Sequence, residues 1–500
     1  MSRINGVSRS MPNLWGLLIG VLLAVLSASC NTEVRGPEFT RPQTGAFYTY
    51  IGDYPVGDVL AFRTNITGLK LRKTGSTDQF ETIFPTSTLY ISLKLDFANL
   101  RDFSTIMHMA TATVGSYDQV VLTLSNPQLV FYDPSVDPPI KKINGRLSTA
   151  DPAAPLPTDY SIVKDKLNVV HLDFDMLKSI QLDQDGQVTD NVTPHLTATP
   201  VAPTPADGYG FFDNLSGFVR TVSPNPISGF SGSFVLQTIG DSGPALTVYV
   251  TSGTDMYGVS DLRSLETGRF VELGAYVDEK GNVVARTVEV EDRAIVEEKR
   301  IAFIGTVLPP LVKDASGNVT QFKLYVRAEE PDMSREIPLD SIVTVNVPSS
   351  AYFQVSSRPS NFAFIPFDAT SIVVGQDLIV HGKYTLTTDQ PTVVDASSIY
   401  LKIQTMQGGL ASLIHVGSDG KSGAFQLGPS ATLLRGTPIL VMTYNQTAFV
   451  NVFGLAEILP QAPLLVRGLP FYVKEAALIR DIPVPAGTVV FLARQVHQLQ

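Results

Sequence analysis

The strongest structural signal in the chain is the stretch Phe270-Val-Glu-Leu-Gly-Ala-Tyr-Val-Asp-Glu-Lys-Gly-Asn-Val-Val-Ala-Arg-Thr-Val-Glu-Val290. Two runs rich in apolar and β-branched residues, 271–277 and 283–290, flank the turn sequence Asp278-Glu-Lys-Gly-Asn282. A short turn containing glycine between two such runs is typical of a β-hairpin. We therefore expect two antiparallel strands in this stretch.

The hairpin lies in a unit that recurs weakly three times in the second half of the chain. Each unit opens with a glycine and an apolar run, continues with a strand led by phenylalanine, and later has a strand that closes on glycine. The first two units add a final strand, and the third is the most diverged. About five short strands per unit predict a small closed or partly open barrel, because closure removes exposed strand edges. The matching positions are Gly217, Gly305 and Gly409, then Phe234, Phe322 and Phe425, then Gly274, Gly382 and Gly468.

The composition of the 500 residues agrees with a strand-rich chain. Charged residues make up only 17%, and there are 38 Gly and 34 Pro, which argues against coiled coils, long-helix bundles and charge-driven disorder. The 47 Asp and Glu outnumber the 37 Lys and Arg, for a formal charge of −10, so the chain has no electrostatic footprint for nucleic acid. The single cysteine excludes an intramolecular disulfide and any multi-cysteine metal site.

The first half of the mature chain shows short alternating runs, of which Leu167-Asn-Val-Val-His-Leu-Asp-Phe-Asp175 is an example. Alternation with period two predicts strands, and the Pro-rich residues 199–208 predict a linker after them. The predicted fold class is therefore all-β, with an N-terminal β-sandwich followed by three small barrel-like (OB-like) β repeats.

The N-terminus has the pattern of an export signal. Residues 1–13 contain two arginines and no acid, and an apolar run follows at 14–26, too short to span a bilayer. The run leads through Ser27-Ala28-Ser29 directly into Cys30, the only cysteine. This arrangement resembles a bacterial lipoprotein signal peptide, which implies that Cys30 becomes the new N-terminus and carries acyl chains.

The lipoprotein resemblance has one departure, because the usual leucine three residues before the cysteine is Ser27 here. The alternative is an ordinary signal peptide cut near Ser29. With two or more acyl chains on Cys30, the protein would stay on a membrane essentially permanently. Asn31 follows the cysteine, and by analogy this permits sorting to the outer membrane of a bacterium with two membranes. The expected location is the cell envelope, at the periplasmic or surface side of the outer membrane.

These patterns divide the chain into seven segments. We predict a signal peptide at 1–29, a tether at 30–45, the β-sandwich at 46–198, the Pro-rich linker at 199–208, and repeats at 209–300, 301–405 and 406–500.

Two parts of the chain resemble known families. The block Val170-His-Leu-Asp-Phe-Asp-Met-Leu-Lys-Ser-Ile180, with Asp185-Gly186 and Val192-Thr-Pro194 after it, is similar to a bacterial lipoprotein domain of unknown function, number 4382. The three repeats resemble a second, barrel-like domain of unknown function, number 5666, which is often found in tandem in envelope proteins. Neither family has an established activity, so the resemblance implies a fold and a compartment but no chemistry.

Candidate metal ligands occur at two places. His171, Asp173 and Asp175 alternate with apolar residues, and one imidazole with two carboxylates on one strand face could bind a divalent cation. A straight strand spaces them about 6.5–7 Å apart, so a solvent-facing or cross-strand hydrogen-bonding face is the favoured interpretation. Asp183 and Asp185 lie in a run that resembles a calcium loop, but its glycine stands at the fourth position rather than the sixth, which favours a β-turn.

One candidate nucleophile is Ser242, in Gly240-Asp-Ser-Gly-Pro244. The stretch copies part of a serine-protease signature, but a proline replaces the second glycine, and the flanking apolar runs favour a hairpin loop. The sequence thus predicts no catalytic residue and no cofactor. We expect a lipid-anchored envelope protein that binds or scaffolds an envelope protein or a glycan. The alternatives are a secreted hydrolase and a carbohydrate-binding or adhesin module.

Overall fold

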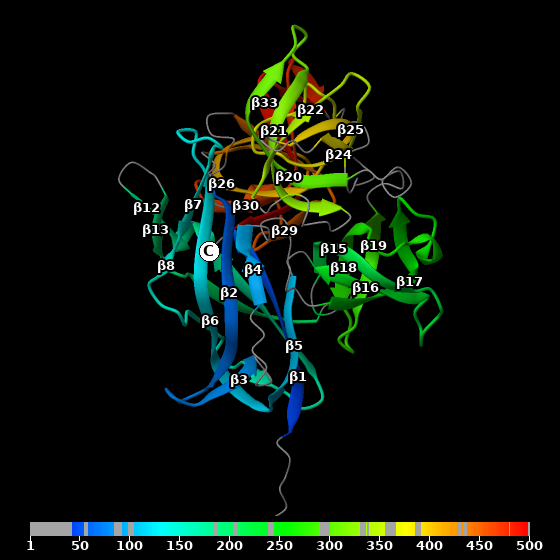
Figure 1. Ribbon diagram of the computed structural model, residues 1–500. Helices are drawn as coiled ribbons and strands as arrows, with labels where there is room; N and C mark the ends of the chain where they lie inside the picture. The colour runs from blue at the N-terminus through cyan, green and yellow to red at the C-terminus, as the bar shows by residue number, and fades with distance from the viewer. Residues whose placement is uncertain are drawn as a thin grey trace, which may run out of the picture. The chain divides into compact units, whose positions relative to one another are not determined.

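The computed structural model describes residues 43–500 with short gaps (Figure 1). The gaps are 55–58, 85–92, 99–104, 184–187, 204–208, 210, 239–244, 291–300, 331–336, 338–339, 356–366, 386–391, 429–432, 434–437, 480 and 499–500. The described chain is built almost entirely from β-strands, which confirms the predicted all-β class. No helix in the described part is long and apolar enough to cross a membrane.

The first domain is a β-sandwich. One sheet has the order β14-β11-β1-β5, and the other is built on the long neighbours β2 and β6. Apolar side chains from both sheets meet in one core, where the rings of Phe62, Phe97 and Phe174 stack with centroids 4.3–5.7 Å apart. The sandwich strands are β1 (Thr44–Tyr54), β2 (Val59–Lys73), β3 (Phe80–Phe84), β4 (Leu93–Asp96), β5 (Thr105–Thr113), β6 (Gly115–Tyr132), β7 (Ile140–Asn144), β9 (Ala153–Pro155), β10 (Ser161–Ile162), β11 (Leu167–Asp175) and β14 (Leu196–Val201).

A small appendage is formed mainly by residues between β11 and β14, together with the earlier strand β8. It consists of the one-turn helix α2 and a three-stranded sheet of order β12-β13-β8. Its elements are α2 (Met176–Ser179), β8 (Arg146–Leu147), β12 (Ile180–Leu182) and β13 (Val188–Val192).

Three five-stranded barrels follow. The strand order of barrel 1 is β15-β16-β17-β19-β18, closed by pairing of β15 with β18, and only the β17–β19 pairing is parallel. This is the order of the OB-type Greek-key barrel. The elements of barrel 1 are β15 (Phe211–Ser223), β16 (Gly232–Thr238), β17 (Ala245–Tyr257), the 3-10 turn η2 (Leu262–Ser264), β18 (Phe270–Val277) and β19 (Val283–Val290). The predicted hairpin is therefore confirmed as β18 and β19.

Barrels 2 and 3 have the same topology with the third strand broken in two. In barrel 2 the halves β22 and β23 both pair in parallel with β25, and in barrel 3 β28 and β29 both pair in parallel with β33. Barrel 2 contains β20 (Ile301–Lys313), β21 (Val319–Glu330), β22 (Ile342–Asn346), β23 (Tyr352–Val355), β24 (Asp377–Thr385) and β25 (Val393–Leu401). Barrel 3 contains β26 (Gln404–Val416), β27 (Gly423–Leu427), β28 (Ile439–Thr443), β29 (Ala448–Val450), η3 (Leu455–Glu457), β30 (Pro463–Val473) and β33 (Thr488–Gln498).

Barrel 3 is complete although its sequence is the most diverged. The proline-containing tail forms the small hairpin β31 (Ala477–Ile479) and β32 (Ile482–Val484), which is inserted before the final strand β33. The fifth strand that the sequence pattern lacks is thus displaced along the chain rather than missing.

Backbone bonding aligns the three barrels residue by residue. In each first strand one residue exchanges two backbone hydrogen bonds with the loop before the fourth strand; these residues are Val219, Val307 and Leu410. The glycine two positions earlier is Gly217, Gly305 and Gly408 respectively. The sequence alignment of the repeats on Gly409 is therefore wrong by one residue. A Cβ on Gly408 would lie 2.7 Å from Leu427 Cγ, whereas one on Gly409 would meet nothing within 3.6 Å, so only the first position requires glycine.

Two predicted boundaries also shift. Strand β1 starts at Thr44, inside the predicted tether 30–45, because Thr44 and Gly45 already pair antiparallel with β5. Strand β14 continues to Val201, three residues into the predicted linker 199–208, because Thr199, Pro200 and Val201 lie opposite β11 residues. Prolines are tolerated there since β14 is the edge strand of its sheet.

Candidate functional site: the buried charged junctions

The predicted row His171, Asp173 and Asp175 lies on β11, but both aspartates are buried. Of the two favoured interpretations, burial excludes a solvent-facing row for the two aspartates, and the cross-strand hydrogen-bonding face stays a prediction. Leu167 and Val169, four and two residues before His171, belong to the core cluster of barrel 1, so the outer face of β11 is covered rather than open. Asp175 is the N-cap of α2, where its carboxylate accepts a hydrogen bond from the Lys178 amide at 3.0 Å and pairs with the Lys178 ammonium at 3.1 Å.

A residue far along the chain approaches this row. The electrostatic environment of His497 on β33 includes Asp173 and His171 of this row. Burial lowers the pKa of His171 to about 4, and burial likewise lowers the pKa of His497, with Asp173 opposing the change. Both rings are therefore neutral near pH 7. Within the described residues, no three His, Cys, Asp or Glu side chains are grouped closely enough to hold a metal ion.

The remaining sequence candidates do not join this group. Asp183 is exposed just after β12. Asp185, Ser242 and the lipidation candidate Cys30 lie outside the described residues.

The most concentrated buried polar cluster joins the sandwich to barrel 2 and is called here the Arg63 junction. Arg63 lies in the middle of β2, between Asp96 on β4 and Gln128 on β6, its partners in the sheet. Its Nε lies 3.3 Å from Asp96 Oδ2, and its Nη1 lies 3.4 Å from Gln128 Oε1. The neighbouring strands thus orient the guanidinium, which points its remaining donors out of the sandwich.

The guanidinium binds Asp340, which precedes β22 in barrel 2, in a bidentate manner. Arg63 Nη2 lies 2.5 Å from Asp340 Oδ1, and Nη1 lies 3.0 Å from Oδ2. Two further donors reach the same carboxylate, the Tyr325 hydroxyl at 2.5 Å and the Lys142 ammonium at 2.8 Å. Charge-assisted, bidentate bonds of this kind are the strongest polar contacts in proteins.

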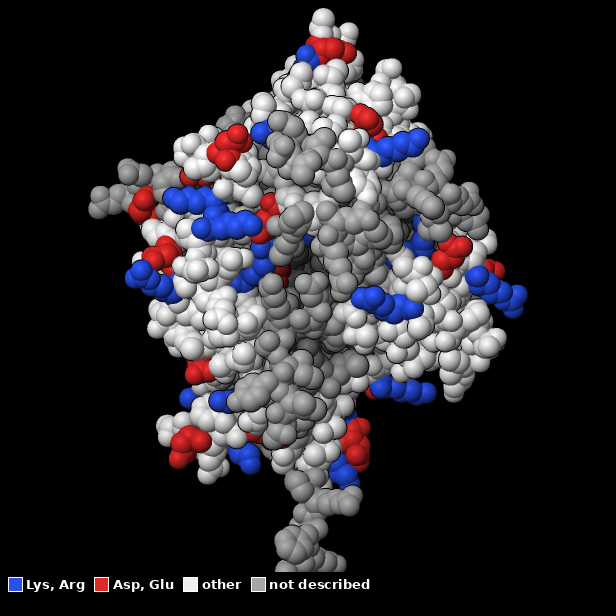
Figure 2. All heavy atoms as spheres, in the orientation of Figure 1, with Lys and Arg blue, Asp and Glu red and all other residues white. Residues whose placement is uncertain are grey.

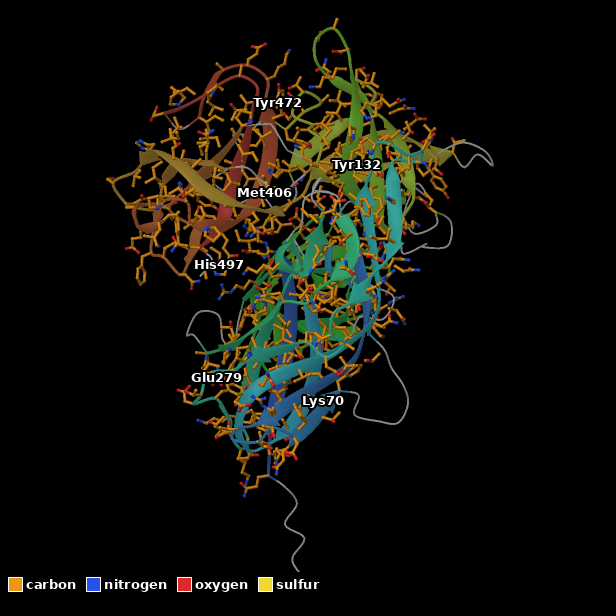
Figure 3. The ribbon with its side chains drawn as sticks, turned by 90° about the vertical axis from the view of Figure 1, so that its left-hand side faces the viewer. Lys70, Tyr132, Glu279, Met406, Tyr472 and His497 are labelled. Carbon is orange, nitrogen blue, oxygen red and sulfur yellow. The ribbon has the colours of Figure 1, made fainter. Side chains whose placement is uncertain are left out.

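Apolar contacts surround the Arg63 junction. Leu60, Ala61 and Val130 of the sandwich pack with Leu308 and Tyr325 of barrel 2 in one buried cluster. Tyr132, which packs against this cluster, is labelled in Figure 3 at the end of β6. The Arg63–Asp340 pair is therefore largely buried, with side chains 8% and 4% exposed, whereas Lys142 is 47% exposed.

The pKa shifts at the Arg63 junction keep its central pair charged. Burial opposes ionisation of Asp340, but the hydrogen bonds and charge of Arg63, with Lys142 and Tyr325, lower its pKa to about 2. Burial by itself would lower the pKa of Arg63, but the bond to Asp340 and the charge of Asp96 raise it above its ordinary value. Burial also raises the pKa of Asp96. Burial raises the pKa of Tyr325 well above its ordinary value, so the tyrosine keeps its hydroxyl proton and remains a hydrogen-bond donor.

A second buried ion pair lies between barrels 1 and 2. Lys402, which follows β25, pairs with Glu272 on β18, and both side chains are 2% exposed. The Lys402 ammonium also lies 5.6 Å from the centre of the Phe270 ring, a cation–π distance. Around it, Phe218 and Phe270 of barrel 1 pack against apolar residues of barrel 2.

Barrels 2 and 3 meet through apolar side chains instead. One core cluster runs from Phe303 and Phe322 in barrel 2 to Phe471 and Leu492 in barrel 3. Within the described residues, the domains are thus joined by the two ion-pair sites, by the core shared between barrels 2 and 3, and by the packing of Leu167 and Val169 into the core of barrel 1.

On the face that Figure 2 presents, the charges of the described residues show no comparable concentration. Figure 2 shows Lys and Arg interspersed with Asp and Glu on the face it presents, without a broad patch of one sign. The charged groups of the Arg63 junction are buried and bond to one another. Their role is therefore structural: they hold the sandwich and barrel 2 together.

Sequence reasoning missed every residue of these junctions. A signal was present, because Arg63 interrupts the apolar run Val59-Leu-Ala-Phe62 and Lys402 interrupts Ile399-Tyr-Leu-Lys-Ile403. A charged residue within a buried run requires a buried partner. The partners lie up to 277 residues away in the sequence, so the pattern alone does not identify them.

Comparisons with known proteins agree with the sandwich assignment. Residues 44–189 match the family model described as Domain of unknown function (DUF4382), which confirms the predicted resemblance for the N-terminal domain. A search of curated proteins finds no match. The matched segment covers less than a third of the chain, and the resemblance of the repeats stays a prediction.

Proposed function

We propose that this chain is a lipid-anchored binding or scaffolding protein of the bacterial cell envelope and that it carries out no catalysis. The observation that carries the proposal is the Arg63 junction, supported by the Lys402–Glu272 pair. Buried ion pairs are often no more stabilising than apolar contacts of the same volume, but they require one defined partner geometry. Their use between domains suits a protein whose domains must hold fixed positions.

A fixed arrangement favours binding because it lowers the entropy lost on association. A protein of this kind presents surfaces from four domains at set spacings to an envelope protein or a glycan. The OB-type barrel is a common binding module. The membrane attachment rests on the lipoprotein pattern that ends at Cys30.

The anchor is tested by metabolic labelling with a fatty-acid analogue. We expect the wild-type protein to be labelled and to fractionate with membranes, and Cys30→Ala to lose both properties. Equal labelling of the two proteins, or no labelling of the wild type, would contradict the anchor.

The binding role is tested by chemical crosslinking in intact envelopes, followed by capture of the anchored protein. We expect the same partner in independent preparations and its loss when Arg63→Ala loosens the junction. Labelling of the wild type, but not of Ser242→Ala, by a serine-directed fluorophosphonate would instead favour the hydrolase. Saturable binding on a glycan array would identify the partner class as carbohydrate.

A further inference from the structure

The first strand of each barrel projects beyond its pairing with the fourth strand. Pairing between the first and fourth strands stops at the equivalent residues Val219, Val307 and Leu410. Each of these residues makes two backbone hydrogen bonds to the loop that precedes the fourth strand. From there on, within the described residues, each first strand is paired only with the second strand. As far as the described residues show, each barrel thus has an open strand edge.

Two of the three open edges carry residues that discourage pairing. The edge of β15 is short and begins with Arg220, and the edge of β20 reads Leu308-Pro-Pro-Leu-Val-Lys313. Proline lacks the amide that a ladder needs, and charge on an edge opposes pairing with another chain. These two edges are protected.

The open edge of β26 has no such protection. It reads Ala411-Ser-Leu-Ile-His-Val416, with no proline, lysine, arginine or acid, and all six residues are exposed. Leu413, Ile414 and Val416 are among the exposed large hydrophobic residues of the described chain. In the same fold and at the same position, only barrel 3 has an apolar, uncharged edge.

More apolar surface flanks this edge. The segment 453–462 contacts the β26–β27 hairpin at both ends, through the Leu455 amide on Gly420 O at 2.9 Å and the Gln461 amide on Leu410 O at 3.2 Å. This segment exposes Phe453 by 84% and Leu459 by 61%. Exposed apolar residues gathered beside an open backbone edge are typical of an interaction surface.

We propose that the open edge of β26 pairs antiparallel with the same edge of a second copy of this chain. An open ladder edge takes an extended strand, and a twofold axis brings identical edges together. Like charges directly opposite one another destabilise a strand pair, and a twofold axis can place identical charges in that position. The β26 edge has no Lys, Arg, Asp or Glu that could repel its copy. Each copy contributes five exposed apolar side chains, namely Leu413, Ile414, Val416, Phe453 and Leu459. Together, the two copies would bury an apolar area on the order of 1,000 Å², which is the lower limit of a specific interface.

The inference goes beyond the proposed function, because it holds whether or not Cys30 is acylated. It also sets a geometry for the envelope protein, since two copies joined at barrel 3 would present two sandwiches and two sets of barrels.

The test is sedimentation velocity of the full chain carrying Cys30→Ala, so that neither lipid nor a native thiol contributes. We expect a monomer–dimer equilibrium that Ile414→Lys weakens about tenfold or more, because a twofold pairing places the two new charges close together. The matched control is Val312→Lys on the protected edge of β20, where the side chain is 46% exposed against 49% for Ile414. This control should dimerise like the parent.

Crosslinking locates the contact independently. In the same background, single cysteines at Ser412, Leu413 and Ile414 should give a disulfide-linked dimer at the position nearest the twofold axis, because opposed residues there lie within disulfide reach. A cysteine at Val312 should give none. Circular dichroism of each variant should match that of the parent and so exclude misfolding.

Two results would overturn the proposal. One is a monomer at all concentrations up to about 0.1 mM, where even a weak specific dimer is populated. The other is a dimer that survives Ile414→Lys unchanged, which would place the self-contact elsewhere. Neither result bears on the anchor or on the capture of a different partner.

Discussion

Arg63→Ala should destabilise the joined domains far more than loss of an ordinary ion pair. The side chains of Arg63 and Asp340 are 8% and 4% exposed, and Arg63 also contacts Asp96, so the truncation leaves two carboxylates with weakened partners in a largely buried junction. Removing one partner of a buried ion pair costs about 3–5 kcal/mol. Lys142 and Tyr325 still hold Asp340, so we expect the lower end of this range.

The same strand supplies the control. Arg72 on β2 pairs with Asp118 at 2.8 Å, but these side chains are 28% and 26% exposed. Exposed pairs contribute about 0–1 kcal/mol, so Arg72→Ala should change stability by that amount only. The two variants remove the same side chain from the same strand and differ in burial.

The assay is urea unfolding followed by far-UV circular dichroism, together with limited proteolysis. Arg63→Ala should lower the urea concentration at the midpoint of the first unfolding transition. It should also expose new protease cleavage sites between the sandwich and barrel 2. Arg63→Lys should recover part of the loss, because it restores the charge but not the bidentate geometry. An Arg63→Ala protein with the unfolding midpoint and cleavage pattern of Arg72→Ala would refute the reasoning.

Three further predictions follow from the same contacts. The pKa of Asp340 is lowered to about 2 in the folded protein, so its ionisation stabilises the fold above the unfolded-state pKa near 4, and this stability is lost as the pH falls toward 2. The free energies of unfolding of wild type and Asp340→Asn should therefore differ by about 2 kcal/mol or more at pH 7 and become equal in acid. At the second junction, Glu272→Leu and Lys402→Leu should each cost about 3–5 kcal/mol, whereas the double variant should recover most of the loss; additive losses in the cycle would show that the pair is not coupled. Gly468→Ala should cost about 1–3 kcal/mol in thermal unfolding, because its Cβ would lie 1.9 Å from Leu492 O, whereas Gly409→Ala, with no atom within 3.6 Å, should be near neutral.

Local patterns were enough to predict the fold class. The hairpin at 270–290 forms as expected because runs rich in apolar and β-branched residues and the turn Asp278-Glu-Lys-Gly-Asn282 both specify it. The barrel repeats could be found because their bulge glycines recur. A Cβ on Gly382 or Gly468 would lie within 2.3 Å of a carbonyl oxygen on the neighbouring strand, so the same packing requires glycine in each copy.

The site could not be found in the same way. Arg63 and Asp340 are joined only by the docking of two domains, and nothing near either residue in the sequence specifies the other. For the row from His171 to Asp175, alternation left a solvent-facing and a cross-strand hydrogen-bonding face open, and the burial of both aspartates excludes the first for them. Strand periodicity identifies two faces of a strand but not what packs against the second one.

The most direct test of the central claim is a distance distribution between the sandwich and barrel 2. In a Cys30→Ala chain, which has no other thiol, spin labels can be placed at the exposed turn residues Thr77 and Ala315 and measured by double electron–electron resonance. A scaffold held by the Arg63 junction predicts one narrow distribution that broadens on Arg63→Ala and not on Arg72→Ala. A broad distribution in the parent chain, unchanged by Arg63→Ala, would contradict the account.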